Sequence, residues 1–379
     1  MYPLRVFGAM LADSRRVNAY AEAITTAVRP GDVVVDIGCG AGLFSLLPCR
    51  AGARRVFAIE ADECIQAARE LAIANGLGDV IEFFQNDSSR TELPERANVI
   101  VSDIRGVLPL FRDAIPALED ARHRFLVPGG IMIPQRDMLK AALIEAPETY
   151  SKLTAPWGIQ PAGLDLSSPR LQILNQLHSE NFRSEQLVTA PLDWGVLDYT
   201  VGAQTRVEAE LEFDVIREGT IHGVCVWFEA KLFGNIGYSS QPGSQSVHGQ
   251  MFLPWLKPVG VEEGTKIHVG LHSDLVTGEY IWRWEAKTHG TSVHPAIDFA
   301  QSTFQGATFS QQSLRRRERN YIPALSDIGQ AELWILERMK GDVTLQSIAQ
   351  GAFEEFPLLF TTWQAAFHLV TEISARLSR

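Results

Sequence analysis

Asp36-Ile-Gly-Cys-Gly-Ala-Gly42 is the stretch that decides the fold of this chain. It closes a short β-branched segment, residues 32–37, and leads into a helical stretch that reaches about Ala51. The glycines at 38, 40 and 42 let the backbone bend sharply and approach a ligand without interference from a Cβ atom. Amides at the start of the following helix then face that ligand. This order predicts a nucleotide-type binding loop.

Acidic residues around the turn sharpen the prediction. Asp36 lies two residues before the first glycine, and Glu60 ends the second predicted strand, eighteen residues after Gly42. An acid at that place accepts both hydroxyls of a ribose. Asp87-Ser88 ends the third strand, where it is placed to meet an adenine edge. This layout favours S-adenosylmethionine (AdoMet) over dinucleotides, which usually require the spacing GxGxxG. The expected cofactor-binding residues here are Asp36, Gly38, Cys39, Gly40, Gly42, Glu60, Ala61, Asp87, Ser88 and Ser102.

Hydrophobic periodicity divides the rest of the chain. Up to about residue 134, strands alternate with helices, which predicts a parallel, doubly wound α/β sheet preceded by a helix over residues 10–28. Beyond it, alternating runs predict antiparallel strands in a barrel or a sandwich. From residue 326 the period becomes helical again. The expected domains are 1–134 (Rossmann-like), 135–290 (β-barrel), 291–325 (linker) and 326–379 (helical or winged-helix-like), with expected strands at 56–59, 80–84, 97–101, 126–133, 205–215, 222–233, 266–271 and 280–286.

Composition excludes several classes of protein. The 379 residues are 46% hydrophobic and 21% charged, as in soluble globular proteins of two or three domains. Apolar runs are too short to span a membrane, and the N-terminus lacks the apolar core of a secretory signal. Four cysteines without paired or metal-type spacing indicate free thiols in a cytoplasmic protein and no metal site. The net charge of −11 argues against nucleic-acid binding, although the basic run 315–319 is an exception.

Several of these motifs together resemble the protein arginine methyltransferases. The resemblance rests on residues 36–42, 52–56, Glu60 and 128–130, and on Met10-Leu-Ala-Asp-Ser-Arg-Arg16, which is similar to the N-terminal helix of that family. It implies that Arg16 binds the AdoMet carboxylate, a role that suits the guanidinium fork. It also implies a β-barrel after the Rossmann-like domain and a homodimer formed through an arm, here residues 150–187 with Trp157, Leu164 and Leu171 as anchors.

The acceptor loop differs from that family. The family form Ser-Glu-Trp-Met-Gly, followed by a second Glu, corresponds here to Ser102-Asp103-Ile-Arg-Gly106 followed by Arg112. Two arginines would repel a substrate guanidinium and would suit an acceptor that carries a carboxylate or phosphate. Alternatively, both arginines pair with Asp103, Asp113 or Glu119 at the surface.

Three residues are candidates for catalysis. Asp103, at the end of the fourth strand, is expected on the substrate side together with Arg112. The Thr-His-Trp element of the family corresponds to Ser246-Val-His248-Gly249. His248 is either a general base or a barrel histidine satisfied by backbone.

The last segment has a distinct helical pattern of residues. Residues 329–349 resemble the small winged-helix, peptide-binding domains of the pyrroloquinoline-quinone-biosynthesis D type. A helical appendage that packs on the barrel or dimerises is the alternative.

These observations predict an AdoMet-dependent methyltransferase that acts on N or O of a peptide, a protein side chain or a carboxylate-bearing small molecule. Three alternatives stay open: a protein arginine methyltransferase, a non-catalytic AdoMet-binding sensor or scaffold, and an RNA methyltransferase that uses the basic run at 315–319.

Overall fold

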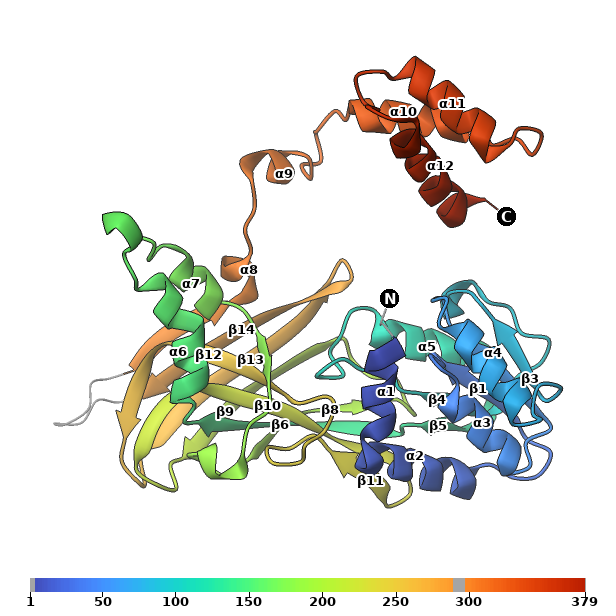
Figure 1. Ribbon diagram of the computed structural model, residues 1–379. Helices are drawn as coiled ribbons and strands as arrows, with labels where there is room; N and C mark the ends of the chain where they lie inside the picture. The colour runs from blue at the N-terminus through green and yellow to red at the C-terminus, as the bar shows by residue number, and fades with distance from the viewer. Residues whose placement is uncertain (1–3, 289–296, 379) are drawn as a thin grey trace. The chain divides into compact units, whose positions relative to one another are not determined.

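The computed structural model describes residues 4–288 and 297–378 (Figure 1). Its first half contains a parallel sheet with strand order β3-β2-β1-β4-β5. All five strands predicted in this half are present. Their bounds are β1 Val33–Ile37, β2 Arg55–Ile59, β3 Ile81–Phe84, β4 Ala97–Ser102 and β5 Leu126–Ile133. The strand order reverses between β1 and β4, and ligands of open α/β sheets bind at such a point, outside the carboxyl ends of the strands.

Helices accompany this sheet, and the first of them corrects the sequence prediction. The single helix expected over residues 10–28 is broken at Asp13, whose side chain accepts a hydrogen bond from the Arg16 amide at 3.1 Å and caps the second helix. An aspartate at this place satisfies an amide that a helix start would leave unpaired. The helices are α1 Leu4–Ala12, α2 Ser14–Ala27, α3 Leu43–Arg50, α4 Ile65–Ala74 and α5 Ala114–Phe125, with a short 3-10 turn, η1 Ser88–Arg90.

The second half contains two antiparallel sheets. Their strand orders are β7-β12-β10-β6-β8, with β11 paired to β10, and β15-β14-β13-β9. Within the described residues the two sheets are not joined by hydrogen bonds into one closed barrel. The sequence predicted a β-barrel here, and the structure has an antiparallel sheet domain instead. The strands are β6 Arg136–Ile144, β7 His178–Glu180, β8 Leu192–Asp198, β9 Arg206–Asp214, β10 Gly219–Phe233, β11 Ile236–Ser239, β12 Gln250–Val261, β13 Lys266–Val276, β14 Glu279–Thr288 and β15 Ile297–Ser302.

A helical segment leaves the sheets between β6 and β7, at the place where the sequence predicts an arm. It consists of α6 Pro147–Thr154, η2 Ala155–Trp157, η3 Pro161–Gly163 and α7 Pro169–Leu174. Leu164 and Leu171 are 62% and 58% exposed, while Trp157 is half-buried. Two of the three expected anchors therefore present apolar surface to solvent.

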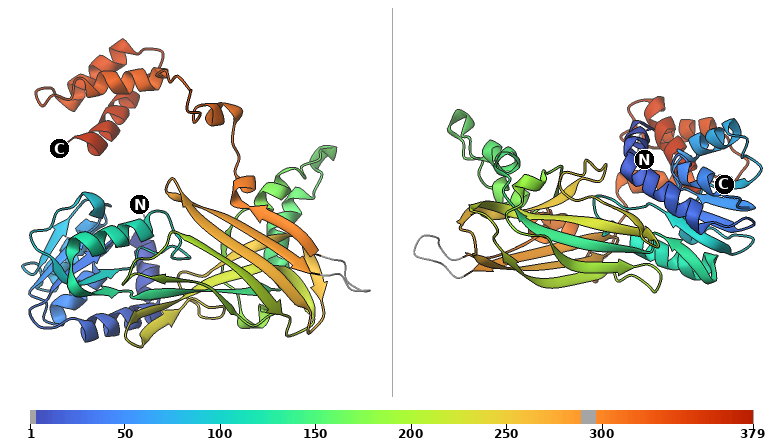
Figure 2. Two further views of the ribbon diagram at one scale, coloured as in Figure 1. Left: turned by 180° about the vertical axis from the view of Figure 1, so that it is seen from behind. Right: turned by 90° about the horizontal axis from the view of Figure 1, so that it is seen from below.

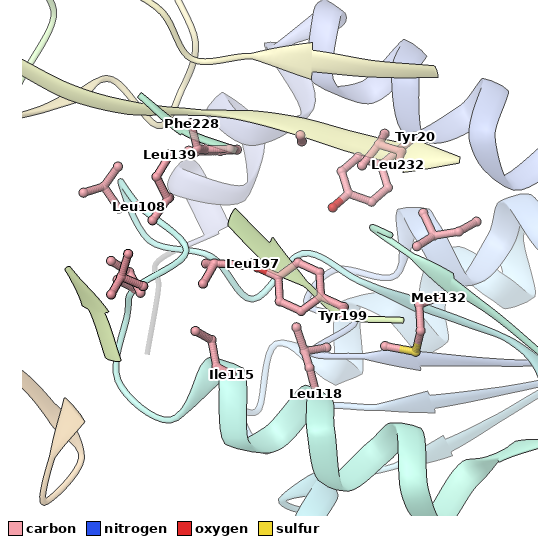
Figure 3. Packing of buried hydrophobic residues seen from close by; sticks show 14 of the residues in the cluster. Tyr20, Leu108, Ile115, Leu118, Met132, Leu139, Leu197, Tyr199, Phe228 and Leu232 are labelled. Atoms are coloured by element: carbon pink, nitrogen blue, oxygen red, sulfur yellow. The ribbon is translucent and has the colours of Figure 1, made fainter. Parts of the chain in front are cut away.

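The parallel and antiparallel halves share one hydrophobic core. Side chains from α2, α5, β8 and β10, among them Tyr20, Leu118, Leu197 and Phe228, gather in one packed region (Figure 3). β11 lies beside α2 in the views of Figures 1 and 2. Residues 1–308 consequently form one compact unit, and the boundary predicted near residue 134 separates two kinds of sheet inside it.

Residues 309–379 form a second unit with its own core. It contains α9 Gln311–Arg315, α10 Asp327–Leu336, α11 Leu345–Glu355 and α12 Trp363–Leu377. No strand occurs among residues 309–378, so the described part of this unit lacks the wing of a winged-helix domain. The part expected as linker, 291–325, contributes β15 and a short helix, α8 Thr303–Gly306, to the first unit.

Candidate cofactor and acceptor site

A cavity of about 520 Å³ opens at the carboxyl edge of the parallel sheet. The glycine turn after β1, the end of β2, the start of α4, the loop after β4 and the inner face of α1 surround it. Its lining includes, among the predicted residues, Arg16, Gly38, Cys39, Gly40, Gly42, Glu60, Ala61, Asp103 and Arg112. The predicted residues among these come from four separate segments, which are α2, the glycine turn, the end of β2 and the loop after β4, and the fold brings them to one cavity.

The glycine turn adopts the backbone that only glycine tolerates well. Gly38, Gly40 and Gly42 have φ values of 70°, 53° and 87°. A Cβ atom on Gly40 would lie 2.5 Å from the ring of Phe7 in α1, and one on Gly42 would lie 2.6 Å from the Cβ atom of Ala68 in α4. The turn is thus packed between two helices, and the amides of Gly38, Cys39, Gly40 and Gly42 already donate within the chain, so what it offers a ligand is bare backbone surface without side chains.

Glu60 is fixed beside the turn. Its Oε2 accepts from the Gly40 amide at 3.0 Å and its Oε1 accepts from the Asp62 amide at 2.9 Å. A carboxylate has about four acceptor positions, so it retains capacity for two ribose hydroxyls.

Arg16 enters the cavity from α2 and is only 4% exposed. Its Nη1 donates to Asp103 Oδ2, and its Nη2 donates to the carbonyl oxygen of Met10 at 2.7 Å. Within the described residues its Nε has no hydrogen-bond partner although it is buried. A buried donor without a partner is costly, and Arg16, which lines the cavity, keeps further N–H groups on its terminal nitrogens for a ligand carboxylate.

The other predicted cofactor residues lie around the cavity without lining it. Asp36 is buried behind the turn, accepts from Ser45 Oγ at 2.6 Å, and its burial raises its pKa to about 7. Asp87 caps η1 and accepts from Ser89, which lowers its pKa. Ser102 is buried and donates to the carbonyl oxygen of Ile37 at 2.9 Å. Ser88 accepts from Arg124 through its backbone. Asp36 and Ser102 are therefore buried groups of the framework, and the cofactor roles of Asp87 and Ser88 stay predictions.

On the acceptor side, Asp103 is already occupied by cations. Its Oδ1 accepts from Arg105 Nη1 at 3.0 Å and from the Tyr20 hydroxyl at 3.1 Å, and its Oδ2 accepts from Arg16. The alternative that Arg105 pairs with Asp103 is therefore realised, but inside the protein. Arg105 is buried and its main partner is Asp137 in β6.

Arg112 differs from Arg105 because it is exposed. It lies at the mouth of the cavity with a left-handed φ of 44°, and its guanidinium stacks on the ring of Phe111. Glu119, one proposed partner, is bound by Arg122 and His123 instead. No ion pair involves Arg112 among residues 4–288 and 297–378.

His248 takes the place of a barrel histidine. It is 8% exposed, its Nδ1 hydrogen-bonds to the carbonyl oxygen of Gly106 at 2.9 Å, and its Nε2 lies 3.3 Å from the Tyr238 hydroxyl. Burial lowers its pKa, and the neutral ring has no nitrogen left for an acceptor proton. It does not line the cavity. The geometry supports the backbone-satisfied alternative over the general base.

Sequence reasoning missed two groups of residues. Phe7, Leu11, Phe44, Ile104 and Phe111 provide the apolar part of the lining. Asp137, Tyr199 and Tyr238 surround Arg105 from the antiparallel half. The one available signal was Asp137 itself, since a charged residue within a strand is rarely buried unless it is paired.

The cavity fits AdoMet. It offers a glycine turn too tight for side chains, an acid on its far side, an apolar wall and a buried guanidinium nitrogen in need of an acceptor. These match a nucleoside with two ribose hydroxyls, a sulfonium centre and a carboxylate.

Known proteins are similar to this chain over the same region. Residues 19–153 match the family model of the ribosomal protein L11 methyltransferase (PrmA). The probable protein arginine N-methyltransferase 6 of Arabidopsis thaliana is 31% identical over 235 residues, which are 59% of this chain and 54% of that protein. Protein arginine N-methyltransferase 6 of Xenopus laevis is 29% identical over 273 residues, 68% of this chain and 80% of that protein.

Solved structures show the same fold. An enzyme–prozyme complex of arginine methyltransferase 1 from Trypanosoma brucei, with AdoHcy, has a TM-score of 0.72 at 20% identity and covers 78% of this chain and 97% of its own. Arginine methyltransferase 10 of Arabidopsis thaliana has a TM-score of 0.69 at 22% identity and covers 78% of this chain and 96% of its own.

The class of protein follows from fold, site and sequence together: the chain is an AdoMet-dependent methyltransferase. Within that class it is similar to the protein arginine N-methyltransferases, whose two-part architecture of a Rossmann-like sheet and an antiparallel sheet domain it shares.

Proposed function

We propose that this chain transfers the methyl group of AdoMet to N or O of a peptide, a protein side chain or a carboxylate-bearing small molecule, and that arginine is not its acceptor. AdoMet, when bound, supplies an electrophilic methyl group on sulfur. The glycine turn and Glu60 hold the nucleoside, and Arg16 binds the carboxylate. The apolar lining excludes water from the reacting atoms.

The observation that carries the choice of acceptor is the occupancy of Asp103. Both of its oxygens are bound by arginines of the chain itself, and the place of the second family acid is taken by Arg112. On this side of the cavity a substrate guanidinium would thus meet an aspartate that already accepts three hydrogen bonds from the chain, beside the cations Arg16, Arg105 and Arg112, which disfavours it. An acceptor with its own carboxylate or phosphate would instead find Arg112 exposed at the mouth of the cavity.

No dedicated base is required for this chemistry. An in-line methyl transfer needs the acceptor atom close to the methyl group and already deprotonated, and holding two reactants in that geometry supplies much of the rate. Arg112 orients the acceptor by its anionic group, and the apolar wall formed by Phe111 and Ile104 limits the remaining freedom.

Protein arginine methylation is the second candidate, because the sequence relatives carry that name. A non-catalytic sensor is disfavoured for the same reason. An RNA acceptor agrees poorly with the net charge of −11.

The test is methyl transfer from tritium-labelled AdoMet to three acceptors: an acidic peptide, a glycine-arginine-rich peptide and a cell lysate. The proposal expects label on the acidic peptide or on non-arginine sites of the lysate. Arg112→Glu should raise KM for the anionic acceptor by roughly tenfold or more, because it replaces a charge-assisted contact with repulsion. Arg29→Glu, an exposed charge reversal away from the cavity, is the matched control.

Label in methylarginine alone would replace the proposal with the second candidate. If no acceptor is labelled, the alternative of a non-catalytic AdoMet-binding sensor would replace the proposal.

Two further properties belong to the proposal. The exposed leucines of the α6–α7 arm support a homodimer. The four cysteines are free, which agrees with a cytoplasmic location. Separately, none of the described helices is both long and apolar enough to cross a membrane.

A further inference from the structure

The buried guanidinium of Arg105 joins the loop after β4 to the antiparallel half. Its Nε and Nη2 donate to the two carboxylate oxygens of Asp137 at 2.9 and 3.0 Å. Its Nη1 lies 2.8 Å from the Tyr20 hydroxyl, 3.0 Å from Asp103 Oδ1 and 3.0 Å from the Tyr238 hydroxyl. Every nitrogen of one side chain is thus engaged, by residues from four separate segments.

The surroundings of Arg105 hold it in one orientation. Its guanidinium lies 5.3 Å from the ring centroid of Phe228 and 5.9 Å from that of Tyr238. Asp137 is fully buried and also accepts from the Tyr199 hydroxyl at 2.7 Å. Buried charges are tolerated when geometry and hydrogen bonds are complete, and removal of one partner leaves the other uncompensated. The pair is therefore rigid.

Asp103 connects Arg105 to Arg16, because it accepts hydrogen bonds from both side chains. Its Oδ1 is bound by Arg105, and its Oδ2 is bound by Arg16 Nη1. Arg16 Nη2 is bound by the Met10 carbonyl oxygen. Both terminal nitrogens of Arg16 are thus fixed and each keeps a second N–H, while its Nε is buried without a partner among the described residues and the residue itself lines the cavity.

We propose that Arg105 is a positioning residue for the cofactor: through Asp103 it holds the guanidinium of Arg16 in the orientation that binds the AdoMet carboxylate. This inference rests on the proposed function, which assigns that carboxylate to Arg16. The row Asp137–Arg105–Asp103–Arg16 alternates in charge, and it runs from β6 of the antiparallel half to α2 at the cavity. Asp103 consequently serves the cofactor rather than the acceptor.

The experiment compares two ligands in binding titrations of the full-length protein. S-adenosylhomocysteine carries the carboxylate that Arg16 would bind, and 5′-methylthioadenosine is the same nucleoside without the amino-acid group. Arg105→Met combined with Asp137→Ala removes the pair without leaving a buried charge alone. The proposal expects Kd for S-adenosylhomocysteine to rise about tenfold or more, as for loss of a well-placed charge-assisted bond, with Kd for methylthioadenosine unchanged within about twofold.

Two variants complete the design. Arg16→Ala should show the same selective loss, and combining it with the Arg105 and Asp137 changes should add little, because both act on one contact. Arg54→Met, which removes an arginine of a surface ion pair with Glu95, is the matched control and should change neither Kd. If the double variant fails to fold, Arg105→Lys keeps the charge but not the fork and should give a smaller selective loss.

An equal loss for both ligands, or no loss for either, would overturn the positioning role. If the unchanged protein binds methylthioadenosine as tightly as S-adenosylhomocysteine, the assignment of Arg16 to the carboxylate is itself wrong, and the inference falls with it.

Discussion

The carboxyl group of Asp36 lies beneath the glycine turn, 1% exposed, with Ser45 Oγ at 2.6 Å and the acids Glu60 and Asp103 nearby. Burial first, and then those acids, raise its pKa from 3.8 to about 7. Between these values the unfolded chain releases the proton while the folded protein retains it, so stability falls as pH rises from about 4 to about 7.

Asp36→Asn should remove this dependence. The difference in Tm between variant and unchanged protein is expected to grow by at least about 3 °C between pH 5 and pH 8, measured by thermal unfolding. Asp79→Asn, on an exposed turn, controls for the loss of one carboxyl. A difference in Tm that is the same at both pH values would show that Asp36 is ionised alike in both states.

Gly42 permits a test of the turn by comparison with Gly76. Both have a left-handed φ, of 87° and 69°, so alanine at either position costs about 1–2 kcal/mol. Only at Gly42 would the new Cβ meet another atom, Ala68 Cβ at 2.6 Å. Gly42→Ala should therefore lower the free energy of unfolding by about 1–3 kcal/mol more than Gly76→Ala in urea titrations. Equal losses would mean that α4 moves aside freely.

At single residues, the sequence predicted what local spacing determines. The glycines, Glu60 and Arg16 all line the cavity because they belong to one βαβ unit or to a motif beside it. The partner of Arg105 was not predictable, since Asp137 lies 32 residues further along and nothing local selects it. Whether the imidazole of His248 is free or satisfied by backbone depends on its contact with Gly106, 142 residues away. The partner of Arg105 and the bonding of His248 are both determined by contacts between residues that lie far apart in the sequence.

Among the secondary-structure elements, the strands of the parallel sheet were predictable because glycine turns and polar residues mark where each strand begins and ends. β6 and β12 were missed because neither shows a clean alternation: β6 carries Arg136, Asp137 and Lys140 among its apolar residues, and β12 carries two prolines. The break between α1 and α2 was missed although Asp13-Ser14 is a common helix start. The sequence predicted that the antiparallel half closes into a barrel. Alternation of apolar and polar residues indicates where strands lie, but it does not indicate which strand edges pair.

The arm between β6 and β7 is expected to hold two copies of the chain together. Leu164→Glu with Leu171→Glu places charges on the two exposed anchors and should halve the mass measured by light scattering, as expected when an apolar contact between copies is lost. Ile73→Glu on α4 is the control, because Ile73 is also exposed, at 73%, but lies outside the arm. An unchanged mass in the arm variant would count against this dimer contact.

For the whole molecule, the separate core of residues 309–379 predicts that the two units can be separated. The cluster formed by α10, α11 and α12, including Ile335, Ile348 and Val370, involves no residue of the first unit. A chain ending at residue 308 should fold, unfold in one transition and bind S-adenosylhomocysteine within about twofold of the full-length Kd. Loss of binding on truncation would mean that the C-terminal unit takes part in the cofactor site.

The most direct test of the central claim is a crystal structure with S-adenosylhomocysteine bound. The claim is that Asp103 is committed to the chain's own arginines, so that the acceptor site has no acid for a guanidinium. We predict that the ligand carboxylate binds Arg16, that Asp103 stays bound to Arg16 and Arg105, and that Arg112 stays exposed at the cavity mouth. An Asp103 carboxylate released from both arginines and facing the acceptor side would contradict it.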